Sequence, residues 1–127
     1  MNRFVDTNIL VRLLAQDEPK QLKEVTRQIN LHASDELIIL DGVLVELFFV
    51  LEYNSLYHFK RTLIIELFQK LVIDTPQFHL SETALAAFEL FEQHPKLDFM
   101  DCLLATSANQ KANKLITFDK ELLKTLR

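Results

Sequence analysis

The sequence predicts an α/β fold with a parallel sheet, and two observations support this. Short apolar runs, each long enough for one buried strand, alternate with helical patterns of about ten residues or more. An aspartate follows each apolar run closely, where a strand would leave the sheet. The 127 residues suffice for one hydrophobic core, and we expect a single domain over residues 1–127.

In the N-terminal part, the first strand is expected over Arg3–Val5, because the apolar residues there stop at a polar group. A short helix is expected over residues 8–14. Acids and a proline at residues 17–19 are typical of a helix start, so a second helix is predicted to about Leu31. The continuous apolar run Leu37–Leu40 predicts a strand covered on both faces.

Asp41 is expected to cap the next helix, over residues 42–53. Residues 58–70 have apolar side chains at helical spacing, and the apolar run 71–73 predicts a third strand. Further along the chain, helices are expected over residues 81–93, 98–110 and 119–126, with a fourth strand over Lys114–Thr117.

Composition excludes several classes of protein. The single cysteine, Cys102, permits no internal disulfide, and this favours a reducing cytoplasm. The four histidines show no metal-ligand spacing. There is no signal-peptide pattern and no apolar run long enough to span a membrane, so we expect a cytoplasmic protein that does not enter a membrane. The net charge is −4, but residues 111–127 are basic, a weak indication of a basic rim.

A structural role explains four carboxylates less well than it explains the other acids of the chain. Asp6 and Asp119 follow expected strands, and Asp101 lies in an otherwise mostly apolar helix. Glu46 lies in a helix with apolar residues nearly all round, which predicts burial, and a buried carboxylate is costly without a partner. Each aspartate also has an ordinary reading as a helix cap or first-turn acid, and for Asp98 that reading is favoured.

Convergence of such acids would need a counter-charge. Two carboxylates about 4 Å apart repel by roughly 4 kcal/mol at an effective dielectric of 20. Either some protons stay bound or a divalent cation binds. Oxygen ligands favour magnesium or manganese, and such an ion can activate water against a phosphodiester.

Four motifs in order resemble those of the PIN-domain nucleases. The first is Phe4-Val5-Asp6-Thr7-Asn8-Ile9-Leu10, the second is the glutamate of Val43-Leu44-Val45-Glu46-Leu47, the third is the aspartate of Asp98-Phe99-Met100-Asp101-Cys102, and the fourth is Leu115-Ile116-Thr117-Phe118-Asp119. Residues 11–21 further resemble a branch of the VapC-type toxins of toxin–antitoxin pairs. The resemblance covers nearly the whole chain.

The resemblance implies a three-layer α/β/α sandwich with strand order 3-2-1-4-5 and a magnesium- or manganese-dependent ribonuclease. It implies catalytic and metal-binding roles for four acids: Asp6, Glu46, Asp101 and Asp119. It further implies that four residues support these acids, orienting a carboxylate or a water: Thr7, Asn8, Thr117 and Asp98. We expect Arg12 and Lys120 to contact the phosphates of the RNA substrate.

The sequence departs from the family pattern at two places. Family members usually have a fifth strand after the position of Asp119, but the residues up to Arg127 contain too little apolar sequence for one. We therefore expect either a clipped chain or an open sheet edge. Asp98 lies one helical turn before Asp101, and either of them could be the closer ligand.

Three functions compete at this point. The first is a metal-dependent endoribonuclease that acts as a toxin, with an antitoxin protein as partner and a homodimer as assembly, both of which the resemblance implies. The second is a PIN-like binding module without catalysis, against which the complete set of four acids argues. The third is a phospho-receiver domain, which would have an acidic pair after the first strand, whereas Asp6 is followed by Thr7. The sequence does not indicate the RNA target or the number of metal ions.

Overall fold

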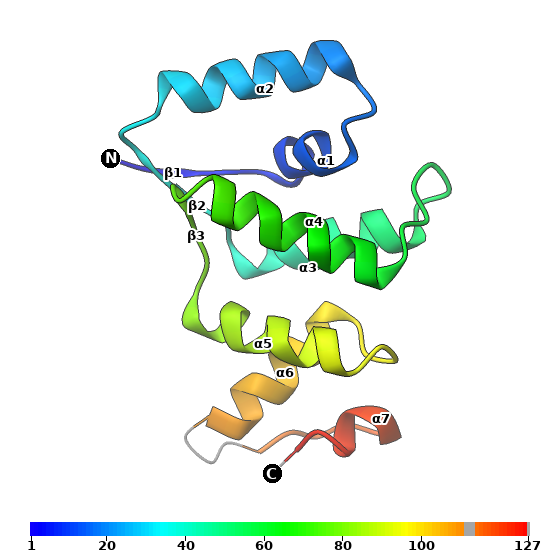
Figure 1. Ribbon diagram of the computed structural model, residues 1–127. Coiled ribbons are helices and arrows are strands. Elements are labelled where there is room, and N and C mark those ends of the chain that lie inside the picture. The colour runs from blue at the N-terminus through cyan, green and yellow to red at the C-terminus, as the bar shows by residue number, and fades with distance from the viewer. Residues whose placement is uncertain (111–113, 127) are drawn as a thin grey trace. The chain divides into compact units, whose positions relative to one another are not determined.

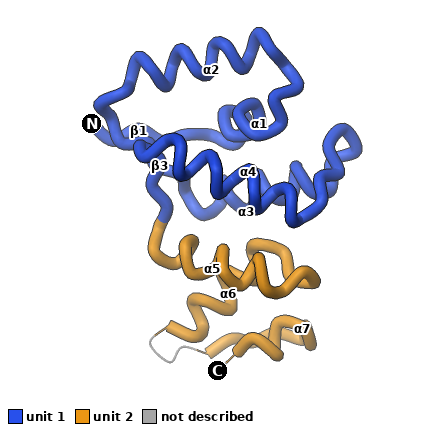
Figure 2. Tube along the Cα trace, viewed as in Figure 1, with its two compact units in different colours: residues 1–80 blue, residues 81–127 orange. Residues whose placement is uncertain are grey.

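Strands and helices alternate through the first half of the chain, as the sequence predicts. A computed structural model describes residues 1–110 and 114–126 (Figure 1). The chain divides into two compact units, which are coloured separately in Figure 2: unit 1 is Met1–Leu80 and unit 2 is Ser81–Arg127. Each unit has its own set of packed helices.

Unit 1 contains all of the strands in the described residues. Its elements in chain order are β1 (Asn2–Phe4), α1 (Thr7–Ala15), α2 (Pro19–Leu31), β2 (Glu36–Ile38), α3 (Asp41–Tyr53), α4 (Arg61–Asp74) and β3 (Phe78–His79). The strands form a parallel sheet with β2 in the middle. The α/β class predicted from the sequence is therefore confirmed, with three short strands as its sheet.

The register of the sheet places alternate side chains of β2 on opposite faces. Leu37 pairs with Arg3 on one side and with Phe78 on the other, and both Leu37 and Phe78 are buried. The hydrogen bonds continue beyond the strand ends, since the backbone N–H of Val5 donates to the carbonyl of Ile38 at 3.1 Å. Strand β1 ends at Phe4, and the hydrogen bond of Val5 continues its pattern, so the sheet fixes the backbone position of Asp6.

The third strand lies elsewhere than predicted. Residues 71–73, expected as a strand, form the end of α4, which continues to Asp74. The strand comes after Pro76, at Phe78–His79. The helical spacing of the buried residues Ile64 and Phe68 simply continues into the apolar run, so the helix extends by one more turn.

Three helices of unit 1 bury its apolar core. Helix α1 packs against both α3 and α4, and α3 packs against α4. The most buried side chains of these helices are Leu10, Leu44, Leu47, Leu51 and Ile64. Phe48 of α3 meets Phe68 of α4 edge to face, with 5.2 Å between the ring centroids. This packing positions the N-terminus of α1 and the outer face of α3, which carry the predicted site residues of unit 1.

Unit 2 is helical in its described residues. Its elements are α5 (Glu82–Gln93), α6 (Phe99–Asn109) and α7 (Lys120–Leu123). Helix α5 packs closely against α6, and small buried residues such as Ala84 and Ala105 leave room for this close approach. Phe91 and Phe99 pack edge to face at 5.5 Å. Ser81 caps α5 through a hydrogen bond from the N–H of Ala84, as the sequence predicts.

The fourth strand expected at Lys114–Thr117 is not formed, because residues 114–119 have no regular secondary structure. Ile116 and Phe118 are fully exposed. A strand of this kind is stabilised by a neighbouring strand and by burial of one face, and within the described residues of unit 2 this segment has neither. None of the helices in the described part of the chain is long and apolar enough to cross a bilayer.

Candidate active site

Asp6 caps the N-terminus of α1 and belongs to unit 1. Its Oδ1 accepts a hydrogen bond from the backbone N–H of Ile9 at 3.2 Å, while the side chain remains exposed. The helix cap uses Oδ1 of Asp6, so the other carboxylate oxygen can bind a ligand. Thr7 is buried in the first turn of α1, and Asn8 is exposed beside it. The polar residues after β1 thus end a strand and begin a helix.

A cavity of about 230 Å³ adjoins Asp6. Its lining comes mainly from β1, β2, α1 and α2, and it includes the exposed Phe4, the half-buried Ile9 and the buried Val25. The lining is mostly apolar, with Gln28 as one of its polar members. This cavity could not be predicted from the sequence, because its walls come from segments far apart along the chain.

Glu46 is exposed on α3, and the prediction that it is buried is wrong. It shares the exposed face of this helix with Gly42, Phe49 and Tyr53, which follow one another at spacings of a helical turn. The buried face is formed by other positions, such as Leu44 and Leu47. Exposure removes the argument that the carboxylate needs a buried partner, and it leaves Glu46 open to a ligand from solvent.

Asp98 and Asp101 form a reciprocal capping box at the start of α6. Oδ1 of Asp98 accepts from the N–H of Asp101 at 2.8 Å, and Oδ2 of Asp101 accepts from the N–H of Asp98 at 3.3 Å. Asp98 is therefore the N-cap, as the sequence favours, and Asp101 is a first-turn acid.

Asp101 lies in an environment that disfavours its charge. Partial burial raises the pKa of the Asp101 carboxyl above the usual aspartate value, and repulsion from the carboxylates of Asp98 and Asp119 raises it further. Unit 2 thus brings three predicted site residues within electrostatic range of one another. A cation bound among them would relieve this repulsion.

Asp119 is held at the N-terminus of α7. Its Oδ1 accepts from the N–H groups of Glu121 and Leu122, at 2.9 and 3.1 Å. The N–H of Asp119 donates to Oγ1 of Thr117 at 3.0 Å. Thr117 therefore fixes the backbone that carries Asp119, in keeping with the supporting role expected for it. The adjacent Lys120 is exposed.

Arg12 is engaged within unit 1. Its Nη2 donates to the Tyr57 hydroxyl at 2.7 Å, and its Nη1 lies 3.4 Å from Oδ1 of Asp17. Its side chain is only 16% exposed. Tyr57 is 45 residues away in sequence, so this partner could not be predicted. The contacts favour a structural role for Arg12 over the phosphate contact expected from the sequence.

The donor set suits a hard divalent cation in its chemistry. All four predicted ligands, Asp6, Glu46, Asp101 and Asp119, offer carboxylate oxygens. Within residues 1–110 and 114–126, no three His, Cys, Asp or Glu side chains are grouped tightly enough to hold a metal ion. Asp98 and Asp119 therefore affect the pKa of Asp101, but the three carboxylates do not surround a common point. Asp6 and Glu46 lie in unit 1, on helices that pack against each other.

Comparison with known protein families assigns the chain to a family. The profile of the PIN domain matches residues 3–126. This chain belongs to the PIN-domain family. PIN domains are generally nucleases, often dependent on divalent metals, so membership indicates hydrolysis of nucleic acid. The match runs through both compact units, so all four predicted acids lie within the matched residues. A search of curated proteins finds no match to the chain.

Proposed function

We propose that this PIN-domain protein is an endoribonuclease that depends on Mg²⁺ or Mn²⁺ and acts as the toxin of a toxin–antitoxin pair. The observation that carries the proposal is the grouping of carboxylates in unit 2: Asp98 and Asp101 share a capping box, and partial burial, together with repulsion from Asp98 and Asp119, raises the pKa of the Asp101 carboxyl. A protein that gathers like charges at a cost to its folded state often does so for a ligand of opposite charge. In a PIN domain that ligand is a divalent cation.

Each acid has a defined part in the proposal. Asp6, Glu46, Asp101 and Asp119 hold the ion or its waters. The ion would supply Lewis-acid chemistry, acidifying a water and neutralising charge on the scissile phosphate. Asp98 fixes Asp101 through their capping box, and Thr117 fixes Asp119. Thr7 and Asn8 follow Asp6 directly and support its orientation.

The proposal includes the family's complete architecture. We infer one domain over residues 1–127, a three-layer α/β/α sandwich in which the strands take the order 3-2-1-4-5. Apolar side chains in Leu115–Phe118, two of them exposed, support a strand in that segment when a neighbouring strand is supplied.

The specific role rests on the resemblance of residues 11–21 to the VapC-type toxins. The proposed partners are therefore RNA as substrate, an antitoxin protein that covers the acids, and a second copy of the chain in a homodimer. The proposed location is the cytoplasm, where RNA is accessible and Cys102 stays reduced.

Cleavage of RNA by the variant Asp6→Asn tests the proposal. Asparagine caps a helix as well as aspartate does, so the hydrogen bond to Ile9 and the fold are kept while one negative charge is lost. We expect the wild type to cut single-stranded RNA in Mg²⁺ or Mn²⁺, leaving a 3′-hydroxyl and a 5′-phosphate, and to slow growth of its host. Asp6→Asn should do neither.

The matched control is Asp74→Asn, which changes an exposed aspartate at the end of α4, outside the proposed set. This variant should cut RNA at the wild-type rate. Cleavage by Asp6→Asn at the wild-type rate would show that the site is misassigned. If the wild type bound RNA without cutting it in either metal, the chain would be a binding module, the alternative that the sequence leaves open.

A further inference from the structure

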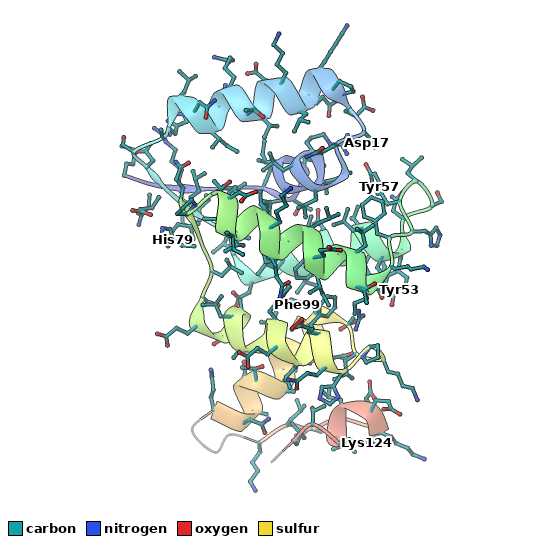
Figure 3. The ribbon with its side chains drawn as sticks, in the orientation of Figure 1. Asp17, Tyr53, Tyr57, His79, Phe99 and Lys124 are labelled. Carbon is teal, nitrogen blue, oxygen red and sulfur yellow. The ribbon has the colours of Figure 1, made fainter. Side chains whose placement is uncertain are left out.

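One face of α3 carries Glu46 together with two exposed aromatic rings. Phe49 follows Glu46 by three residues and Tyr53 follows it by seven, so all three lie along the same side of the helix. Phe49 is 60% exposed and Tyr53 is 51% exposed. Tyr53 ends α3, near the start of α4 (Figure 3). A proposed catalytic acid and an aromatic surface are therefore continuous on one helix.

The two rings hold each other in place. Their centroids are 5.0 Å apart and their planes are tilted by 47°. By contrast, Phe48 on the opposite side of α3 is buried and packs edge to face with Phe68. Phe49 and Tyr53 lie outside the core, and their adjacent rings form an exposed aromatic surface on which a flat apolar ligand can stack.

We propose that Phe49 and Tyr53 stack the bases of an unpaired RNA strand next to the bond that is cut. This inference rests on the proposed function and names two side chains that hold the RNA strand beside a proposed catalytic acid. Stacking is tolerant of sequence, because every base has a flat aromatic face, but it requires bases that are not paired in a duplex. The surface therefore selects single-stranded RNA.

The charges around the rings suit a nucleic acid strand. Glu52 is the only acid between Leu47 and Ile65, and Arg61 neutralises it through two hydrogen bonds of 3.1 Å. His58 and Lys60 are exposed in the segment that follows Tyr53. Apart from the proposed ligand Glu46, phosphates of a strand stacked on the rings would meet basic groups and no uncompensated acid of residues 47–65.

The spacing of the rings predicts which nucleotides they contact. With a rise of 1.5 Å per residue, Phe49 lies about 4.5 Å and Tyr53 about 10.5 Å from Glu46 along the helix axis. Stacked nucleotides in a strand are about 3.4 Å apart. Since the two ring centroids are 5.0 Å apart, the rings reach bases within roughly three nucleotides of the cut, and those nucleotides must be unpaired.

A tryptophan placed at Phe49 tests the proposal directly, because the chain has no tryptophan of its own. The test uses Phe49→Trp in the full chain, combined with Asp6→Asn so that the strand stays intact. The probe is a mixed-sequence single-stranded RNA of about 16 nucleotides, with the same strand in a duplex as comparison. Ile73→Trp, on the exposed side of α4, is the matched control. Binding is followed separately by the anisotropy of labelled RNA.

We expect the single strand to quench the fluorescence of Phe49→Trp, at the same midpoint RNA concentration that anisotropy gives for binding. The fluorescence of Ile73→Trp should not change. Phe49→Ala and Tyr53→Ala should each weaken binding of the single strand by about tenfold, with little effect on the duplex. Tyr53→Phe should bind as the wild type does, because stacking does not need the hydroxyl.

Three results would overturn the proposal, and the first two differ from failure of the proposed function. Binding by anisotropy without quenching of Phe49→Trp would place the strand elsewhere, even if RNA were cut. A change in oligomeric state of Phe49→Ala by size-exclusion chromatography, with unchanged RNA affinity, would make the face a contact between copies of the chain. Absence of any RNA binding by the wild type would contradict the inference and the proposed function together.

Discussion

Asp98 and Asp101 each cap the other's backbone, with the N–H of Asp101 donating to Asp98 at 2.8 Å and the N–H of Asp98 donating to Asp101 at 3.3 Å. This pairing fixes two carboxylates near each other at the start of α6. The hydrogen bonds stabilise the helix end, while partial burial, together with repulsion from Asp98 and Asp119, raises the pKa of the Asp101 carboxyl. Helix capping and a candidate cation site thus use the same side chains.

The first prediction concerns Asp101→Asn and pH. Because folding raises the pKa of Asp101, the folded chain binds more protons at this carboxyl than the unfolded chain does. Its contribution to the free energy of unfolding therefore falls as pH rises from the usual carboxyl pKa through the raised value. We expect Asp101→Asn to melt at a higher temperature than wild type at pH 7, with the gain disappearing below about pH 4.

Thermal melts of both proteins at several pH values, without divalent metal, measure this difference. The comparison between the two proteins removes the effects of other titrating groups, such as Asp35, whose pKa is lowered mainly by its hydrogen bond with Arg3. If Asp101→Asn melted below wild type at pH 7 and matched it in acid, the carboxylate would be stabilising the fold, against the electrostatic argument.

The second prediction separates a structural role for Arg12 from a phosphate contact. Arg12→Ala removes the hydrogen bond to Tyr57 and the ion pair with Asp17, so we expect the free energy of unfolding to fall by about 1–2 kcal/mol. Denaturant unfolding checks this. Arg27→Ala is the control, since Arg27 pairs with Glu24 on an exposed face of α2 and its loss should hardly change stability. Equal effects of the two variants would contradict a structural role for Arg12.

The third prediction assigns the phosphate contact to Lys120. This exposed lysine follows Asp119 directly, whereas Lys124 on the same segment pairs with Glu121 at 3.3 Å. Lys120→Ala should weaken RNA binding and reduce the slope of log affinity against log salt by about 1. Lys124→Ala should leave that slope near its wild-type value. A slope unaffected by Lys120→Ala, measured by anisotropy over a range of salt, would place the phosphates elsewhere.

Much of the helical structure could be predicted because its signals are local. Pro19 begins α2, Ser81 caps α5 and Asp98 caps α6, as the sequence indicates. Short strands carry much weaker signals. The run 71–73 is rich in residues that favour strands, yet it completes α4, while the two-residue strand β3 follows Pro76 without a distinctive pattern.

Burial was harder to predict for helices with many apolar residues. Helix α3 has apolar side chains nearly all round, so its exposed face could not be distinguished from its core face by pattern. Phe49 and Tyr53 lie on the exposed face, and Glu46 lies with them. The four acids were proposed from the sequence, because their order and context resemble the PIN-domain pattern, and their assignment to the site stays a prediction. The contact between Arg12 and Tyr57 depends on tertiary structure and could not be predicted from the sequence.

Binding of Mn²⁺ by isothermal titration calorimetry tests most directly the central claim that four carboxylates serve one cation. Asparagine or glutamine at each position keeps the shape of the side chain and removes its charge, and at Asp6 and Asp119 it preserves the helix cap. We predict that Asp6→Asn, Glu46→Gln, Asp101→Asn and Asp119→Asn each weaken binding by about tenfold or more, and that Asp74→Asn does not. Wild-type affinity in Asp6→Asn and Glu46→Gln would contradict the claim.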